Sequence, residues 1–143
     1  MRWLVCVAGL LISLGAVAQG PKPSPIQGVW VVKEARRDGK DANELAGHRV
    51  ILAKERFVIT SKDGKPVYAG SYRTDAGKVP PTIDFVHTLG TYKGKTWKGI
   101  YELTGDTMRI CDNAPNLEGP RPMDFKAAAG SGTVCVLCVR KEP

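Results

Sequence analysis

The sequence has few of the residues from which catalytic and metal sites are built. Its 143 residues include two histidines and four cysteines, and no serine stands in a Gly-x-Ser-x-Gly motif. Asp84 is close to His87 in sequence, but on a strand these two side chains face opposite sides. Most acidic residues flank expected turns, so their spacing identifies no carboxylate pair of the glycosidase kind. We therefore predict that the protein is not an enzyme and has no cofactor or metal ion.

Long apolar runs are missing beyond the first 18 residues, and a membrane span needs about 20. The first 18 residues combine a basic start, an uncharged apolar stretch and a final Ala-Val-Ala, the small-x-small pattern that signal peptidase recognises. We expect a signal peptide over 1–18, cleavage before Gln19, a secreted or periplasmic protein and no membrane span. The segment 19–25 is expected to be an extended spacer because it is rich in proline.

Dense runs of one charge are missing as well. Lysine and arginine total 21 against 14 aspartate and glutamate, which gives a formal net charge of +7. The basic residues are scattered, and the largest groups, within 36–40 and 93–98, lie beside glycines at expected turns. A nucleic-acid site would need a basic cluster or stripe on one face. We therefore expect no nucleic-acid partner.

Alternating side chains predict strands along most of the chain. The 16 glycines and 10 prolines are too many for a helical bundle, and they mark turns between short runs of β-branched and aromatic residues. Residues 41–47 are compatible with one short helical turn. The expected strands are 27–35, 49–53, 56–61, 66–74, 82–88, 96–103, 107–111 and 133–140, with a further edge strand at 121–126.

The spacing of the turns predicts an all-β fold. Turn residues recur about every 8 to 12 positions, and no segment is long enough for the helix of a βαβ unit. Consecutive antiparallel pairing follows, and closing the sheet would remove its exposed edges. We predict one domain over 26–141, an antiparallel up-and-down barrel of about eight strands.

The cysteines favour a structural role over a chemical one. Cys135 and Cys138 have the CxxC spacing of redox and zinc sites, but a strand directs positions i and i+3 to opposite faces. In an exported protein we expect a disulfide from Cys111 to either Cys135 or Cys138, which leaves one thiol over. Three buried, reduced cysteines are the alternative.

Several sequence blocks carry a family resemblance. They are Ile-Gln-Gly-Val-Trp at 26–30, the turn at 37–40, the long block 94–111, Arg-Pro at 121–122 and Gly-Ser-Gly at 130–132. Together they resemble a planctomycete-type family of small uncharacterised secreted domains, over nearly all of residues 26–141. The resemblance implies a lipocalin-like fold and no particular activity or ligand. The opening Gly-x-Trp also looks like the start of lipocalins, where the tryptophan packs across the barrel floor.

Successive side chains of a strand point to opposite faces of the sheet, and in the expected barrel this places one set of aromatic side chains toward the axis. These candidate ligand-binding residues are Trp30, Tyr68, Tyr72, Phe85, Trp97 and Tyr101. In an eight-stranded barrel such residues either fill the interior or leave space for one small ligand. Three tyrosine hydroxyls favour a partly polar interior and a small amphipathic or apolar ligand. The alternative is a side-chain-filled barrel that acts as a non-catalytic, extracytoplasmic protein-interaction module.

Overall fold

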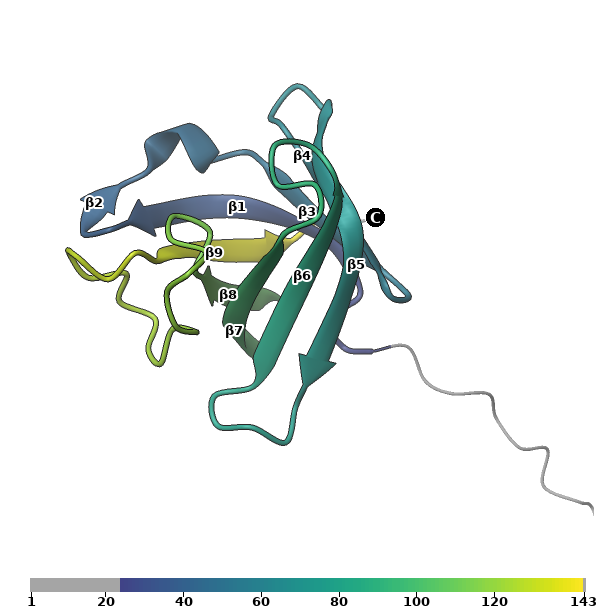
Figure 1. Ribbon diagram of the computed structural model, residues 1–143. Coiled ribbons are helices and arrows are strands. Elements are labelled where there is room, and N and C mark those ends of the chain that lie inside the picture. The colour runs from purple at the N-terminus through teal and green to yellow at the C-terminus, as the bar shows by residue number, and fades with distance from the viewer. Residues whose placement is uncertain (1–23, 143) are drawn as a thin grey trace, which may run out of the picture.

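Nine strands and one short 3-10 helix form within residues 24–142, the part of the chain that the computed structural model describes (Figure 1). The predicted signal peptide, its cleavage site and most of the spacer lie outside these residues. The strands are β1 (Gly28–Arg37), β2 (Lys40–Asp41), β3 (Arg49–Ala53), β4 (Arg56–Thr60), β5 (Pro66–Asp75), β6 (Thr82–Leu89), β7 (Thr96–Thr104), β8 (Thr107–Asp112) and β9 (Val134–Arg140), and the helix η1 is Asn43–Leu45.

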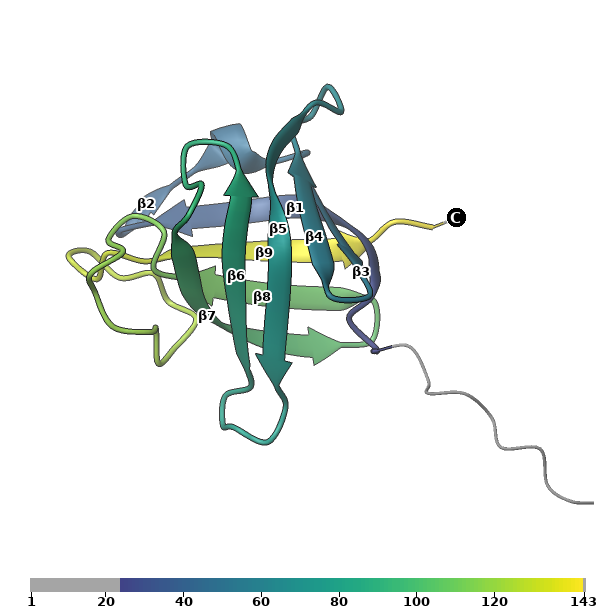
Figure 2. The same ribbon diagram turned by 45° about the vertical axis from the view of Figure 1, so that its right-hand side comes forward.

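Consecutive pairing closes the sheet into a barrel. All neighbouring strands are antiparallel, in the order β2-β1-β3-β4-β5-β6-β7-β8-β9, and β9 pairs again with β1. The short β2 pairs only with the end of β1, so eight strands make the closed wall. Figure 2 shows β5 and β6 crossing over β1, β9 and β8 on the far side. The predicted all-β, up-and-down barrel is confirmed.

One predicted strand does not form. Residues 121–126 belong to an irregular segment, 113–133, between β8 and β9. Because β9 is paired on both sides, by β8 and by β1, the closed barrel offers no free edge to a further strand. The prolines at 120 and 122 also lack the N–H that a strand ladder needs. Side chains hold this segment instead: the Nδ2 of Asn113 donates to the carbonyl of Gly119 at 3.0 Å.

A core of large apolar side chains closes one end of the barrel. Trp30 is fully buried there, its Nε1 donates to the carbonyl of Ile26 at 2.8 Å, and the guanidinium of Arg140 lies 4.3 Å from its ring centroid. Buried side chains around it come from the whole circumference: Leu52, Tyr72, Ile83, Tyr101, Met108 and Cys138. This end of the barrel is therefore filled by side chains.

Gly70 allows β5 and β6 to approach each other under an aromatic ring. A Cβ at this position would lie 1.8 Å from the carbonyl oxygen of Val86 and 3.0 Å from the ring of Phe57. The register of β5 on β6 also shifts between Ala69 and Gly70. Glycine is therefore required here by close packing.

The cysteines of β9 face opposite sides of the barrel wall. Cys135 forms a disulfide with Cys111, which lies directly opposite it on β8. This is one of the two pairings that the sequence left open. Cys138 is a buried free cysteine of the core, and burial raises the pKa of its thiol to about 12. The thiol is consequently protonated and inert while the protein is folded.

Candidate functional site

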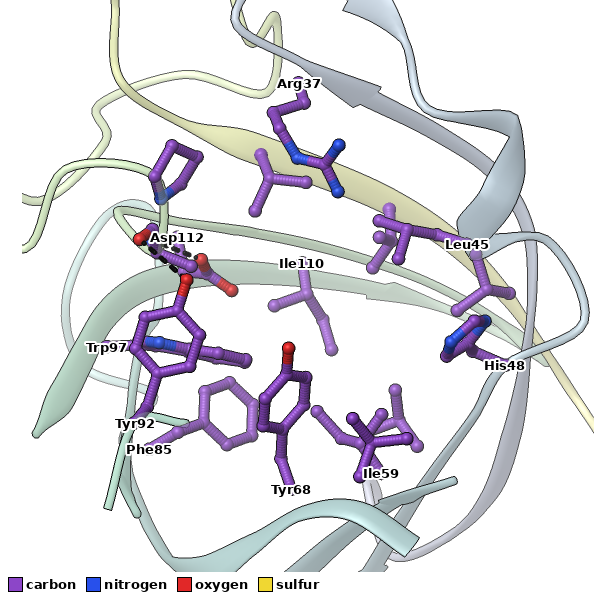
Figure 3. A pocket seen from close by; sticks show the side chains of 17 residues that line it. Arg37, Leu45, His48, Ile59, Tyr68, Phe85, Tyr92, Trp97, Ile110 and Asp112 are labelled. Atoms are coloured by element: carbon purple, nitrogen blue, oxygen red, sulfur yellow. Dashed lines mark hydrogen bonds between the residues drawn. The ribbon is translucent and has the colours of Figure 1, made fainter. Parts of the chain in front are cut away.

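The other end of the barrel contains a cavity of about 360 Å³ (Figure 3). It lies where β1, β6 and β8 end and where β5, β7 and β9 begin, so its lining comes from almost every strand. Aliphatic side chains form much of the wall, among them Val32, Val50, Ile59, Ile110 and Val136. The 3-10 helix adds Leu45, and the segment after β8 adds Ala114 and Pro115. The cavity is thus apolar and is bounded by both barrel wall and loops.

Four aromatic side chains also line the cavity: Tyr68, Phe85, Tyr92 and Trp97. Trp97 is at the centre of this group, with its ring centroid 5.1 Å from that of Tyr68 and 5.0 Å from that of Tyr92. Both pairs meet edge to face, the arrangement that the ring quadrupoles favour. Four elements position the rings, because Tyr68 is on β5, Phe85 on β6, Trp97 on β7 and Tyr92 in the turn between β6 and β7.

His87 lies behind these rings and is buried, with 1% of its surface exposed. Its ring centroid is 4.1 Å from that of Trp97 and 5.1 Å from that of Phe57. Neither ring nitrogen has a hydrogen-bond partner among the described residues. Burial disfavours the charged imidazolium and lowers the pKa of His87 to about 4. His87 is therefore neutral at pH 7 and packs as part of the aromatic group.

Three polar side chains line the cavity with these rings: Arg37, His48 and Asp112. Asp112 is 7% exposed at the end of β8, and its Oδ1 accepts a hydrogen bond of 2.9 Å from the backbone N–H of Ala114. Burial raises the pKa of Asp112 to about 7, although that hydrogen bond favours the charged form. Arg37 is half-exposed, and its guanidinium is 2.6 Å from a carboxylate oxygen of Glu44.

The six aromatic residues selected from the sequence divide into two groups. Tyr68, Phe85 and Trp97 line the cavity. Trp30, Tyr72 and Tyr101 are buried in the core at the closed end and do not line it.

Four further aromatic or polar side chains line the cavity and were not selected from the sequence: Tyr92, Arg37, His48 and Asp112. Tyr92 lies in a turn, where strand alternation gives no direction. Arg37 lines the cavity because the register on β9 shifts between Val32 and Glu34, which reverses the alternation in the second half of β1. The sequence places residue 92 in a loop between the expected strands 82–88 and 96–103, but a loop position does not tell where the side chain points, and no local sequence signal marks the register shift.

Comparison of the chain with protein-family models, with curated proteins and with solved structures finds no match. The fold and the cavity therefore define the class of protein by themselves: a closed antiparallel β-barrel with an apolar, aromatic cavity at one end. Within residues 24–142, no three or more histidine, cysteine or acidic side chains are grouped so that they could hold a metal ion. No helix in that range is long and apolar enough to cross a membrane.

Proposed function

We propose that the protein is an exported, lipocalin-like domain that binds a small apolar or amphipathic molecule in its barrel. The observation that carries this proposal is the cavity itself. Its volume of about 360 Å³ lies within the range of small-molecule sites, roughly 300 to 1,000 Å³. Aliphatic and aromatic walls with a few polar groups are typical of such sites.

The alternative, a protein-interaction module with a filled barrel, has less support. A filled barrel would continue the core of the closed end to the other end, where the cavity lies instead. The large hydrophobic side chains exposed among the described residues, Val79, Leu89 and Met123, come from three separate segments. Docking surfaces instead form contiguous apolar patches.

Export and family membership are part of the proposal. The leader-like segment 1–18 supports export, and the sequence blocks within 26–141 support membership of the planctomycete-type family of small secreted domains. The N-terminal sequence of protein recovered from the periplasm or the medium of its own host tests the first point. A chain that begins at Gln19 supports export, and a chain found only in the cytoplasm with Met1 retained contradicts it.

A titration with the neutral fluorescent probe N-phenylnaphthylamine tests ligand binding. We expect saturable binding of one probe molecule per chain, with enhanced probe fluorescence. Val136 lines the cavity, so Val136→Trp should fill part of it and weaken binding at least tenfold, or about 1.4 kcal/mol. Its neighbour Leu137 lies on the outer side of the same strand, where it lines a different depression, so Leu137→Trp is the matched control and should bind as the wild type does. Absence of saturable binding, or equal affinity in Val136→Trp and wild type, contradicts the proposal.

A further inference from the structure

Asp112 is the one acidic residue among those that line the cavity. None of the ion pairs formed within residues 24–142 includes it, and the backbone N–H of Ala114 is its hydrogen-bond donor. A buried carboxylate is costly unless a positive charge or further donors compensate it. The cavity thus contains a carboxyl group for which residues 24–142 provide no counter-charge.

Electron-rich rings lie on the same side of the cavity (Figure 3). The hydroxyl of Tyr92 donates to the carbonyl of Ala114 at 3.4 Å, while the N–H of Ala114 donates to Asp112, so this one residue joins the tyrosine and the carboxyl. The ring of Tyr92 is in turn next to that of Trp97, and Figure 3 shows Asp112, Tyr92 and Trp97 on one side of the cavity. Tryptophan and tyrosine rings attract cations, most strongly where water is excluded.

The arginine of the cavity has its charge compensated by a glutamate. The guanidinium of Arg37 is paired with Glu44, and Figure 3 shows it on a different side of the cavity from Trp97. An anionic ligand would therefore have to compete with Glu44 for Arg37 and would also face the Asp112 carboxylate. A cationic ligand would meet an unpaired carboxylate and aromatic rings. The local charges favour the cation, even though the chain as a whole has a net positive charge.

We propose that the ligand of this cavity is an amine with an aromatic or aliphatic body, and that its ammonium group pairs with Asp112 beside Tyr92 and Trp97. The aliphatic wall formed by Val50, Ile59 and Ile110 takes the body of the ligand. This inference rests on the proposed function, because it assumes that the cavity binds a small molecule, and it adds the chemical class of that molecule.

Three probes with one phenylethyl body and different end groups test the inference: phenethylamine, phenethyl alcohol and hydrocinnamate. Each is measured by displacement of N-phenylnaphthylamine from the protein at pH 8. We expect the amine to bind at least tenfold more tightly than the alcohol, and the carboxylate to bind most weakly. If the alcohol or the carboxylate binds the wild-type protein as tightly as the amine does, the inference is wrong, and no variant is needed to show it.

Two aspartate variants locate the effect. Asp112→Asn keeps an oxygen that can accept from Ala114, so it should lower the affinity for the amine to that for the alcohol and leave the alcohol unchanged. The matched control is Asp84→Asn, because Asp84 is paired with Arg121 and does not line the cavity. This variant should keep the preference for the amine. A preference that survives in Asp112→Asn, or is lost equally in both variants, refutes the role of Asp112.

The two proposals fail in different ways. If N-phenylnaphthylamine does not bind saturably, the proposed function fails. If the fluorescent probe binds in the cavity but the amine does not displace it, or displaces it no better than the alcohol does, only the assignment of an amine ligand fails.

Discussion

Replacing His87 should make the protein less sensitive to acid. In the folded protein this histidine is enclosed by Phe57, Tyr68, Tyr92 and Trp97, and burial lowers its pKa from 6.5 to about 4. Between these two values the unfolded chain binds a proton that the folded protein does not. The free energy of unfolding is therefore unaffected by His87 above about pH 6.5 and falls as the pH drops from there toward 4.

The expected size of the effect follows from the two pKa values. One pKa unit corresponds to about 1.4 kcal/mol, so the complete loss would be about 3 kcal/mol. The interval from pH 7.5 to pH 5 covers only part of the range between the two pKa values, so over this interval His87 should lower the free energy of unfolding by about 2 kcal/mol.

Urea unfolding of the wild type and of His87→Leu at pH 7.5 and pH 5 measures this loss. Leucine has a similar volume and does not titrate, so the difference in stability between the two proteins should shift by about 2 kcal/mol in favour of the variant at pH 5. The contribution of Asp112 is common to both proteins and cancels. A stability difference between His87→Leu and wild type that is the same at both pH values would refute the reasoning.

Three further predictions concern other buried groups. Burial raises the pKa of Asp112 from 3.8 to about 7, so the wild type loses stability as the pH rises between these values. In urea unfolding, the free energy of unfolding of Asp112→Asn should therefore rise by about 2.5 kcal/mol relative to that of the wild type between pH 5 and pH 8. The absence of such a rise would contradict the burial of the charge. Gly70→Ala should lower the free energy of unfolding, measured by thermal unfolding, by about 3 kcal/mol, because its Cβ would overlap the neighbouring strand. The control is Gly77→Ala, whose Cβ would meet no backbone and which should cost less than about 1 kcal/mol. Similar costs for the two variants would exclude the close approach of β5 and β6 at Gly70. Cys111 and Cys135 are 24 residues apart, so removing the disulfide between them should lower the free energy of unfolding by about 3 kcal/mol in denaturant unfolding. An intact mass that shows no loss of two hydrogens would disprove the bond.

The wall of the barrel was predictable because alternation and turns are local signals. Eight expected strands form, with ends within two residues of the expected ones, because each has alternating faces and most end at or beside a glycine or an aspartate. The strand expected at 121–126 could not be judged locally, since its formation depends on whether the barrel has a free edge. Closure of β9 on β1 removes that edge.

The cavity was less predictable because its position depends on the whole barrel. Alternation identified Tyr68 and Trp97 as inward-facing, and it identified Trp30 and Tyr72 equally well. Which end of the barrel each ring occupies depends on the register of all the strands, and this separates the cavity from the filled core. The direction of the Arg37 side chain was not predictable either, because one extra residue in β1 reverses the alternation that follows it.

Nuclear magnetic resonance with labelled protein tests the central claim most directly, since it follows the open and closed ends of the barrel separately. On addition of N-phenylnaphthylamine, we expect saturable shifts in the signals of Tyr68, Tyr92 and Val136, which line the cavity. The side-chain signals of Trp30 and Tyr101, in the core of the closed end, should change little. Shifts confined to the outer surface of the barrel, or no saturable shift at the three cavity residues, would contradict the claim that this barrel holds a ligand.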